Sequence, residues 1–390
     1  MDRIKQGVVN AALVFASCAI VLVGVELILR HTAFEGLIAS GGEPPEYYID
    51  DVAAGYDIRP NAATTTHSFA DSNYEIWSNE IGCFDNPYNR EKNVLVVGDS
   101  FAWGYTPFED KWGTLLEKYL DERVLKCGVS GYGTRQEYLK ALGLLKEIRS
   151  PDVLIVEHFV NDIQDDQNFM DIKNSSTTPQ ERKETVARTQ ALADIYCTPT
   201  MPSHPLVQRI KCYFRKHSVL YLLTRDAVQS IVSTKFSAFA GIHDAAPYIP
   251  TDKDIAQHEN NLLDFKKLTA SKGIKLLVVV VPSKESVREA TSTDVENKAS
   301  PETQNALVIQ YLKQNRIDYI DALSDMRTEE HATSSSLFWR FDGHLSPTGN
   351  HFLALLIARH LLEKRKNAQA SLEKVTLQLE KEFSYSATSI

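Results

Sequence analysis

A short apolar run that ends abruptly in a polar turn constrains the fold of this chain more than any other feature. The run spans 93–97, reads Asn-Val-Leu-Val-Val, and is followed directly by Gly98-Asp99-Ser100. Buried parallel strands end in this way, because their carboxyl ends open into the crevice where α/β sheets bind ligands. The pattern predicts that the Ser100 hydroxyl faces such a crevice. The alternative is an ordinary turn serine that caps the next helix.

Strand and helix patterns alternate after this run. Strands are predicted at 94–97, 123–127, 153–157, 275–281 and 318–320, and helices at 108–120, from 134, at 254–271, from 301 and at 346–362. Continuation of the last helix toward residue 383 is open. Thr134 and Glu137 have the spacing of a capping box. The alternation predicts an α/β fold, a three-layer α/β/α sandwich with a mostly parallel sheet.

Composition divides the chain into an N-terminal membrane anchor (1–31), a connector and irregular lead-in (32–92), a catalytic domain (93–365) and a C-terminal helical tail (366–390). Residues 163–250 are polar and interrupted by prolines, and they predict a helical insertion over the active-site face, with one helix starting at Thr178-Pro179 and another around Val219 to Leu223. The alternative is an insertion with only a structural role that lies far from the active site.

The first segment carries the membrane signal. Val8 to Leu29 is almost wholly apolar and spans roughly 33 Å as a helix, enough to cross a bilayer. Arg3 and Lys5 precede it, which slightly favours a cytoplasmic N-terminus and an outward-facing catalytic domain, periplasmic or on the outer face. A cleaved signal peptide and a lipoprotein signal at Cys18 are alternatives. Glu26 is expected to snorkel to the headgroups, although a functional role is open.

Charge and cysteine content exclude other classes. A net charge of −9 argues against a nucleic-acid partner, because phosphate binding needs a basic surface. The five cysteines lack CxxC spacing, so no metal site is expected. Cys197 and Cys212 lie in one polar segment. They could form a disulfide with each other or stay as two free thiols, and the sequence leaves both alternatives open.

Four chemical parts of an acyl-transfer site occur in order along the chain. Such a site needs a hydroxyl, a base, a group that orients the base, and donors for the oxyanion. Ser100 supplies the hydroxyl and His344, in a loop before a helix, supplies the base. Asp342 lies two residues before His344, so in an extended segment its carboxylate faces the same way and reaches the imidazole. A surface-loop histidine and a turn aspartate are the alternatives.

The oxyanion donors are predicted at the ends of neighbouring strands. Gly131 follows the second predicted strand and Asn161 follows the third. A glycine allows a backbone N–H to approach substrate closely, and an asparagine amide donates to a developing negative oxygen. Ser100, Gly131 and Asn161 are therefore expected to converge at one sheet edge.

These segments together resemble the SGNH hydrolases, the GDSL-type esterase and lipase family. Gly98-Asp99-Ser100, Ser130-Gly131, Asn161-Asp162 and Asp342-Gly343-His344 are similar to its four blocks. The resemblance implies a flavodoxin-like sheet, no cofactor and ester hydrolysis. It also implies Ser100 as nucleophile, His344 as base, and an oxyanion hole formed by the Ser100 and Gly131 amides with the Asn161 side chain.

The chain departs from the family pattern at three places. Phe159 stands where a glycine is usual, Lys126 where asparagine is frequent, and the acidic residue lies two rather than three positions before His344. The shorter spacing resembles membrane-anchored bacterial members and alginate-type O-acetylation proteins. The segments Asn79 to Asp85 and Val281-Pro282-Ser283-Lys284-Glu285 are also similar to those branches.

The sequence therefore predicts a membrane-anchored serine esterase that acts on an acyl ester, with an acylated glycan of the cell envelope as candidate substrate. An O-acyltransferase that modifies a polysaccharide and a non-catalytic envelope polysaccharide-binding protein are the alternatives.

Overall fold

The computed structural model describes residues 2–31, 47–69, 72–89, 93–175, 213–214, 218–224, 248–288, 300–332, 336–340, 342–365 and 368–383. The chain forms two compact units. The first contains 1–42, 68–72 and 190–244, and the second contains 43–67, 73–189 and 245–390.

A five-stranded parallel sheet is the centre of the second unit. Its strands are β5 (Asn93–Val97), β6 (Arg123–Lys126), β7 (Val153–His158), β8 (Lys275–Val280) and β9 (Asp318–Asp321). The order is β6-β5-β7-β8-β9 and every neighbouring pair is parallel. This is the flavodoxin-like order, in which the chain reverses its direction of winding at the first strand. The predicted α/β fold with a mostly parallel sheet is confirmed.

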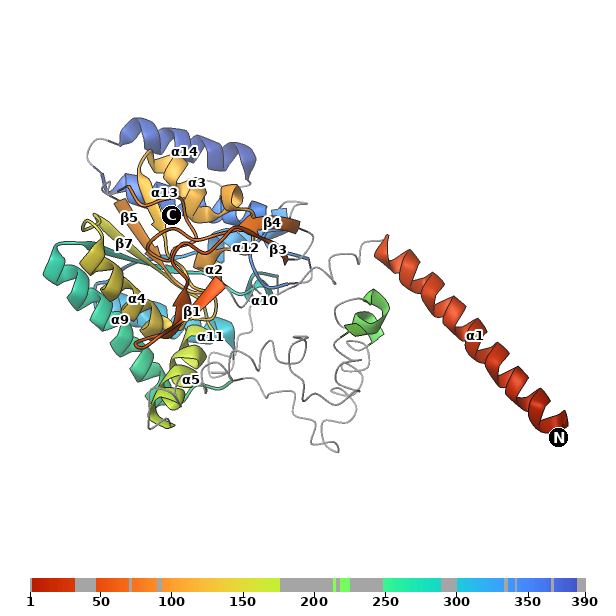
Figure 1. Ribbon diagram of the computed structural model, residues 1–390. Coiled ribbons are helices and arrows are strands. Elements are labelled where there is room, and N and C mark those ends of the chain that lie inside the picture. Colours follow the sequence, from red (N-terminus) through yellow and green to blue (C-terminus); the bar gives the residue numbers. More distant parts are fainter. Residues whose placement is uncertain are drawn as a thin grey trace. The chain divides into compact units, whose positions relative to one another are not determined.

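Helices cover both faces of this sheet (Figure 1). The helices on one face are α3 (Trp112–Leu120), α12 (Leu323–Ala332), α13 (Pro347–Glu363) and α14 (Gln369–Glu382), and those on the other are α4 (Thr134–Glu147), α9 (Asp252–Lys272) and α11 (Pro301–Gln314). Val94 and Val96 of β5 pack into the first core, whereas Leu95 and Val97 pack into the second. This alternation is the period of two that a strand buried on both faces requires.

Short elements lie around the carboxyl edge of the sheet. They are α2 (Ser100–Trp103), a 3₁₀ turn (Phe108–Asp110), α5 (Asp162–Ser175) and α10 (Lys284–Arg288). The single helix predicted at 108–120 is thus the 3₁₀ turn followed by α3, and α13 ends at Glu363 rather than continuing into α14.

The lead-in, expected to be irregular, contains four short strands in two pairs. β1 (Tyr48–Asp51) pairs antiparallel with β2 (Gly55–Ile58), and β3 (Thr65–Phe69) pairs with β4 (Ser72–Ile76). Strands of four or five residues are too short for a clear period of two to stand out in the sequence.

A disulfide between Cys83 and Cys127 joins the lead-in to the residue after β6. The spacing of the cysteines did not predict this pair. Cys197 and Cys212, between which a disulfide was one of two open predictions, lie outside the described residues, as does the helix predicted to start at Thr178-Pro179.

The first unit contains α1 (Asp2–Arg30). Its segment Leu13–Arg30 has a mean hydropathy of 2.3 and none of it is buried, so this helix is long and apolar enough to cross a membrane. A membrane anchor and a signal sequence both have this character. The unit also contains a helical turn at 219–224, where the sequence predicted helix.

Candidate active site

The turn after β5 presents Ser100 at the start of α2. Asp99 caps this helix, with its Oδ1 accepting a hydrogen bond from the Phe101 amide at 2.7 Å. Position 98 has room only for glycine, because a Cβ there would lie 2.6 Å from the Ala102 Cβ and 2.7 Å from Glu157 Oε2. The tight turn leaves Ser100 partly exposed, while its neighbours Asp99 and Phe101 are buried.

The three side chains predicted to act together are in contact. Ser100 Oγ lies 2.8 Å from His344 Nε2, across 244 residues of sequence. His344 Nδ1 lies 2.6 Å from Asp342 Oδ1, and the same oxygen accepts the His344 backbone N–H at 2.7 Å. This double contact orients the imidazole with Nδ1–H toward the carboxylate, so that Nε2 is the ring nitrogen that faces Ser100.

The surroundings of Asp342 keep it ionised. Burial acts to raise the pKa of Asp342, but the hydrogen bond and charge of His344, together with the charge of Lys284, outweigh burial and hold that pKa below its usual value. A carboxylate that stays charged stabilises the imidazolium that forms when His344 takes a proton.

Aromatic rings surround the imidazole. Phe101 and Tyr105 have ring centroids 4.9 and 4.5 Å from that of His344. Phe159, at the position where a glycine is usual in the resembling family, stacks on Phe101 at 4.0 Å. The substitution therefore places an apolar wall behind the ring that packs on His344, which limits the movement of the imidazole.

Lys284, for which the sequence predicted no role in the site, supports the loop that carries Asp342. Its Nζ donates to the backbone carbonyls of Trp339 at 2.6 Å, Arg340 at 2.9 Å and Asp342 at 3.0 Å. Lys284 is the first residue of α10, close after β8, so the sheet fixes its position. One ammonium group thus donates hydrogen bonds to three backbone carbonyls of the loop. A sequence pattern does not show such a contact, because Lys284 lies more than 50 residues before the loop.

The predicted oxyanion donors follow the strands that flank β5. Gly131, after β6, has φ of +77°, a conformation that favours glycine. Its loop is held by Tyr56, whose hydroxyl donates to the Ser130 carbonyl at 2.8 Å, and by Tyr105, whose hydroxyl lies 2.8 Å from Ser130 Oγ. The role of the Gly131 amide toward substrate stays a prediction.

Asn161, after β7, is oriented by the helix that follows it. Its Nδ2 donates to Asp165 Oδ2 at 2.8 Å, which leaves the second amide hydrogen for another acceptor. Burial and the charges of Asp162 and Asp99 raise the pKa of Asp165 to about 8. Donation by Asn161 to an oxyanion likewise stays a prediction.

A layer of buried carboxyl groups lies behind these turns and was not anticipated. Its members, each at most 1% exposed, are Asp99, Glu137, Glu157, Asp162 and Asp166. His158 Nδ1 lies 2.9 Å from Asp162, and His258 Nδ1 lies 3.0 Å from Asp166. Burial, followed by the neighbouring negative charges, raises the pKa of Glu137, Glu157 and Asp162 well above the usual range.

One member of this layer overturns the predicted capping box. The cap of α4 is Gly133, one residue earlier than expected, and its N–H donates to Gln136 Oε1 at 3.3 Å. Thr134 is the first helical residue and Glu137 is buried in the acidic layer. The spacing of Thr134 and Glu137 was therefore misleading, because the carboxyl group is drawn inward. Among the residues that the structure describes, no group of His, Cys, Asp and Glu is arranged to hold a metal ion.

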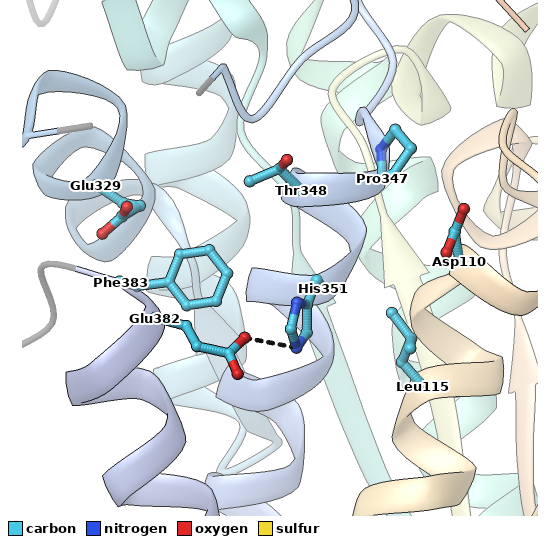
Figure 2. Close-up of a pocket in the computed structure, with 8 residues that line it drawn as sticks. All are labelled: Asp110, Leu115, Glu329, Pro347, Thr348, His351, Glu382 and Phe383. Carbon is cyan, nitrogen blue, oxygen red and sulfur yellow. Dashed lines mark ion pairs between the residues drawn. The ribbon is translucent and has the colours of Figure 1, made fainter. Parts of the chain in front are cut away.

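A cavity of about 380 Å³ lies beside the first turns of α13 (Figure 2). Its walls are Asp110, Leu115, Glu329, Pro347, Thr348, His351, Glu382 and Phe383, and His351 forms an ion-pair contact with Glu382 at 3.6 Å. None of the predicted site residues lines it. Ser100 lies instead after β5, at the carboxyl edge of the sheet, in contact with His344.

Comparison with known proteins found a match to one family model. Residues 244–386 match the family model of the SGNH hydrolase-like domain, acetyltransferase AlgX. None of the curated proteins matches the chain.

Solved structures with distant similarity were also found. A putative lipolytic protein of the G-D-S-L family from Desulfitobacterium hafniense is 13% identical with a TM-score of 0.38, and the match covers 69% of this chain and 99% of that one. The aryl esterase of M. smegmatis is 15% identical with a TM-score of 0.37, covering 70% and 99%. The acetyl xylan esterase AlAXEase is 14% identical with a TM-score of 0.38, covering 67% and 96%.

Proposed function

We propose that this chain, whose residues 244–386 match the model of the SGNH hydrolase-like domain, acetyltransferase AlgX, is a serine esterase that acts through Ser100, His344 and Asp342. The observation that carries the proposal is the continuous hydrogen-bonded series from the Ser100 hydroxyl through the imidazole to the Asp342 carboxylate.

The proposed reaction has two steps. Ser100 Oγ attacks the ester carbonyl carbon while His344 Nε2 takes its proton, and the alcohol leaves with that proton to give an acyl-enzyme. Water then attacks the acyl carbonyl while His344 takes a proton from it, and His344 gives that proton to Ser100 Oγ as the acyl–oxygen bond breaks and the carboxylic acid leaves. Asp342 stays ionised throughout and stabilises the imidazolium in both steps.

The oxyanion is proposed to be held by the amides of Ser100 and Gly131 and by Asn161. These groups follow β5, β6 and β7, which are neighbours in the sheet. Asp165 supports the proposal because it holds one amide hydrogen of Asn161 and so fixes the direction of the other. A donor fixed before reaction stabilises developing charge without reorganisation.

We propose an acylated glycan of the envelope as the substrate class, reached by a single-pass protein anchored through α1. The apolar helix supports membrane attachment, and an outward-facing domain would meet envelope polymers. Neither the acyl chain nor the alcohol is specified by the residues that form the site.

The test is hydrolysis of an aryl acetate by the full chain and by Ser100→Ala, with Ser324→Ala as a matched control because Ser324 is an exposed serine on α12. We expect the first variant to lose turnover and labelling by a fluorophosphonate probe, and the control to keep both. Undiminished hydrolysis by Ser100→Ala would end the assignment. Absence of probe labelling in the unaltered chain would favour a non-catalytic glycan-binding protein.

An O-acyltransferase is the second candidate, and the match to an acetyltransferase domain favours it. The same acyl-enzyme would then be attacked by a sugar hydroxyl in place of water. Incubation with a donor ester and a glycan panel, followed by mass spectrometry of the glycans, separates the two reactions. Transfer that exceeds hydrolysis would identify the transferase.

A further inference from the structure

We propose that residues 213–214 and 218–224 form an interfacial element that lies on the bilayer surface beside the membrane helix, and that Glu26 holds it there. The inference concerns attachment and orientation, and it goes beyond the proposed esterase reaction.

A carboxylate in the apolar helix binds the start of a helical turn that lies far away in sequence. Glu26 Oε2 accepts hydrogen bonds from Ser218 Oγ at 2.8 Å and from the Leu220 amide at 3.0 Å. Glu26 Oε1 accepts from the Val219 amide at 3.0 Å and from Arg30 Nε at 2.8 Å. Four protein donors thus hydrogen-bond to the Glu26 carboxylate, for which the sequence predicted contact with the headgroups. Three of these hydrogen bonds join Glu26 to residues more than 190 positions away in the sequence.

The position of Glu26 fixes the depth of this turn. Glu26 lies four residues before Arg30, where the segment Leu13–Arg30 ends, which is about 6 Å along a helix axis. Charged side chains avoid the hydrocarbon centre and stay near its boundary. The turn at 219–224, whose first amides Glu26 binds, therefore lies at the level of the headgroups when α1 spans a membrane.

The side chains of the element suit a position at the level of the lipid headgroups. Tyr213 and Phe214 are 62% and 44% exposed, and the ring centroid of Phe214 lies 6.1 Å from that of Tyr221. Val219 and Leu222 are buried on the inner side of the same turn. Aromatic side chains outward and aliphatic side chains inward are the arrangement of an interfacial segment, since aromatic rings favour the boundary between lipid and water.

Charge favours an anionic lipid surface as the occupant. The sequence has no Asp or Glu from 195 to 225 but has Lys or Arg at 209, 211, 215, 216 and 225, in a chain of net charge −9. Basic residues beside a membrane helix are attracted to anionic headgroups. The membrane is favoured over a second copy of this chain because Glu26, inside the apolar segment Leu13–Arg30, binds the start of this turn and so keeps the element at the lipid surface.

The experiment uses the full chain in vesicles of phosphatidylglycerol and phosphatidylcholine. A carbene reagent that partitions into lipid labels residues that contact acyl chains, and mass spectrometry maps the labelled peptides. We expect label in α1 and in the peptide that contains Tyr213 and Phe214, well above the label in α9. Vesicles of phosphatidylcholine alone should reduce label in the second peptide but leave it in α1.

Two variants separate the role of Glu26 from that of the helix. Glu26→Ala should lower label in the Tyr213 peptide about fivefold, the typical effect of losing a helix cap, and leave label in α1 unchanged. Asn10→Ala changes a polar residue near the other end of the same helix and should change neither. Hydrolysis of an aryl acetate, measured on the same vesicles, reports separately on the proposed function.

Three results would overturn the proposal. The first is no label in the Tyr213 peptide above that of α9, and the second is equal label with and without Glu26. The third is label that falls as protein density in the vesicles rises, which would indicate that a second copy covers the patch. Absence of label in α1 would also overturn the proposal, because it would show that this helix does not lie in the membrane.

Discussion

Replacement of Lys284 by methionine tests whether the loop that carries Asp342 depends on a single ammonium group. Methionine keeps the length and most of the apolar stem but removes all three donors to the carbonyls of Trp339, Arg340 and Asp342. Hydrogen bonds from a charged donor contribute about 1.5–3 kcal/mol each where buried. Because Lys284 is only half-buried and the three bonds share one group, we expect a combined loss of about 2 kcal/mol, or about thirtyfold in kcat/KM.

The assay is hydrolysis of an aryl acetate together with the rate of fluorophosphonate labelling. Both should fall by the same factor, and the loss should lie in kcat rather than KM, because Lys284 acts through the position of Asp342 and His344. Lys275→Met is the matched control, since Lys275 is an exposed lysine at the opposite end of β8. Lys284→Arg should recover only part of the activity, because a planar guanidinium cannot reach the three carbonyls as one point charge does.

A Lys284→Met variant with unchanged kcat/KM and unchanged thermal stability would refute this reasoning. If the variant unfolds at a much lower temperature, the labelling rate is measured at a temperature where circular dichroism shows both proteins folded. A normal labelling rate there would equally refute the positioning role.

Asp342, Asp165 and the disulfide give three further predictions. Asp342→Asn should lower kcat by on the order of 10³–10⁴-fold in the ester assay with little change in KM, because the amide no longer selects the productive tautomer; a smaller loss than tenfold would contradict the assigned orientation. Asp165 has its pKa raised to about 8, so between pH 6.5 and pH 8 the folded chain holds a proton that the unfolded chain has released, and stability falls as pH rises. The midpoint of urea unfolding should therefore decrease over this window and decrease less in Asp165→Asn, whereas parallel profiles would contradict the shift. Removal of the disulfide by Cys83→Ala and Cys127→Ala, which are 44 residues apart, should lower the free energy of unfolding by about 4 kcal/mol, and reductant should then have no further effect on the denaturation curve.

The sequence determined the strands and the order of the chemical residues. Runs such as 93–97 and 275–280 are buried on both faces, so their composition alone marks them as parallel strands. Ser100, Asp342 and His344 were identified because each stands beside an element end with a local signal, a Gly-Asp-Ser turn in one case and an Asp-Gly-His loop before a capped helix in the other.

The sequence did not predict other contacts between distant segments. The acidic layer of Glu137, Glu157 and Asp162 was missed because burial of a carboxyl depends on what packs around it, and Glu137 was assigned to a cap instead. The Cys83–Cys127 disulfide was missed because the spacing of cysteines does not state which sulfurs meet.

Local periodicity and turn chemistry are properties of neighbouring residues, and the sequence by itself therefore determined the α/β class and the candidate nucleophile and base. The tertiary structure decided three contacts between distant segments. They are the 2.8 Å contact of Ser100 with His344, the hydrogen bonds from Lys284 to the loop of Asp342, and the hydrogen bond from Ser218 to Glu26. Each of these contacts joins segments whose relative positions are set by the packing of the chain as a whole and not by any one segment.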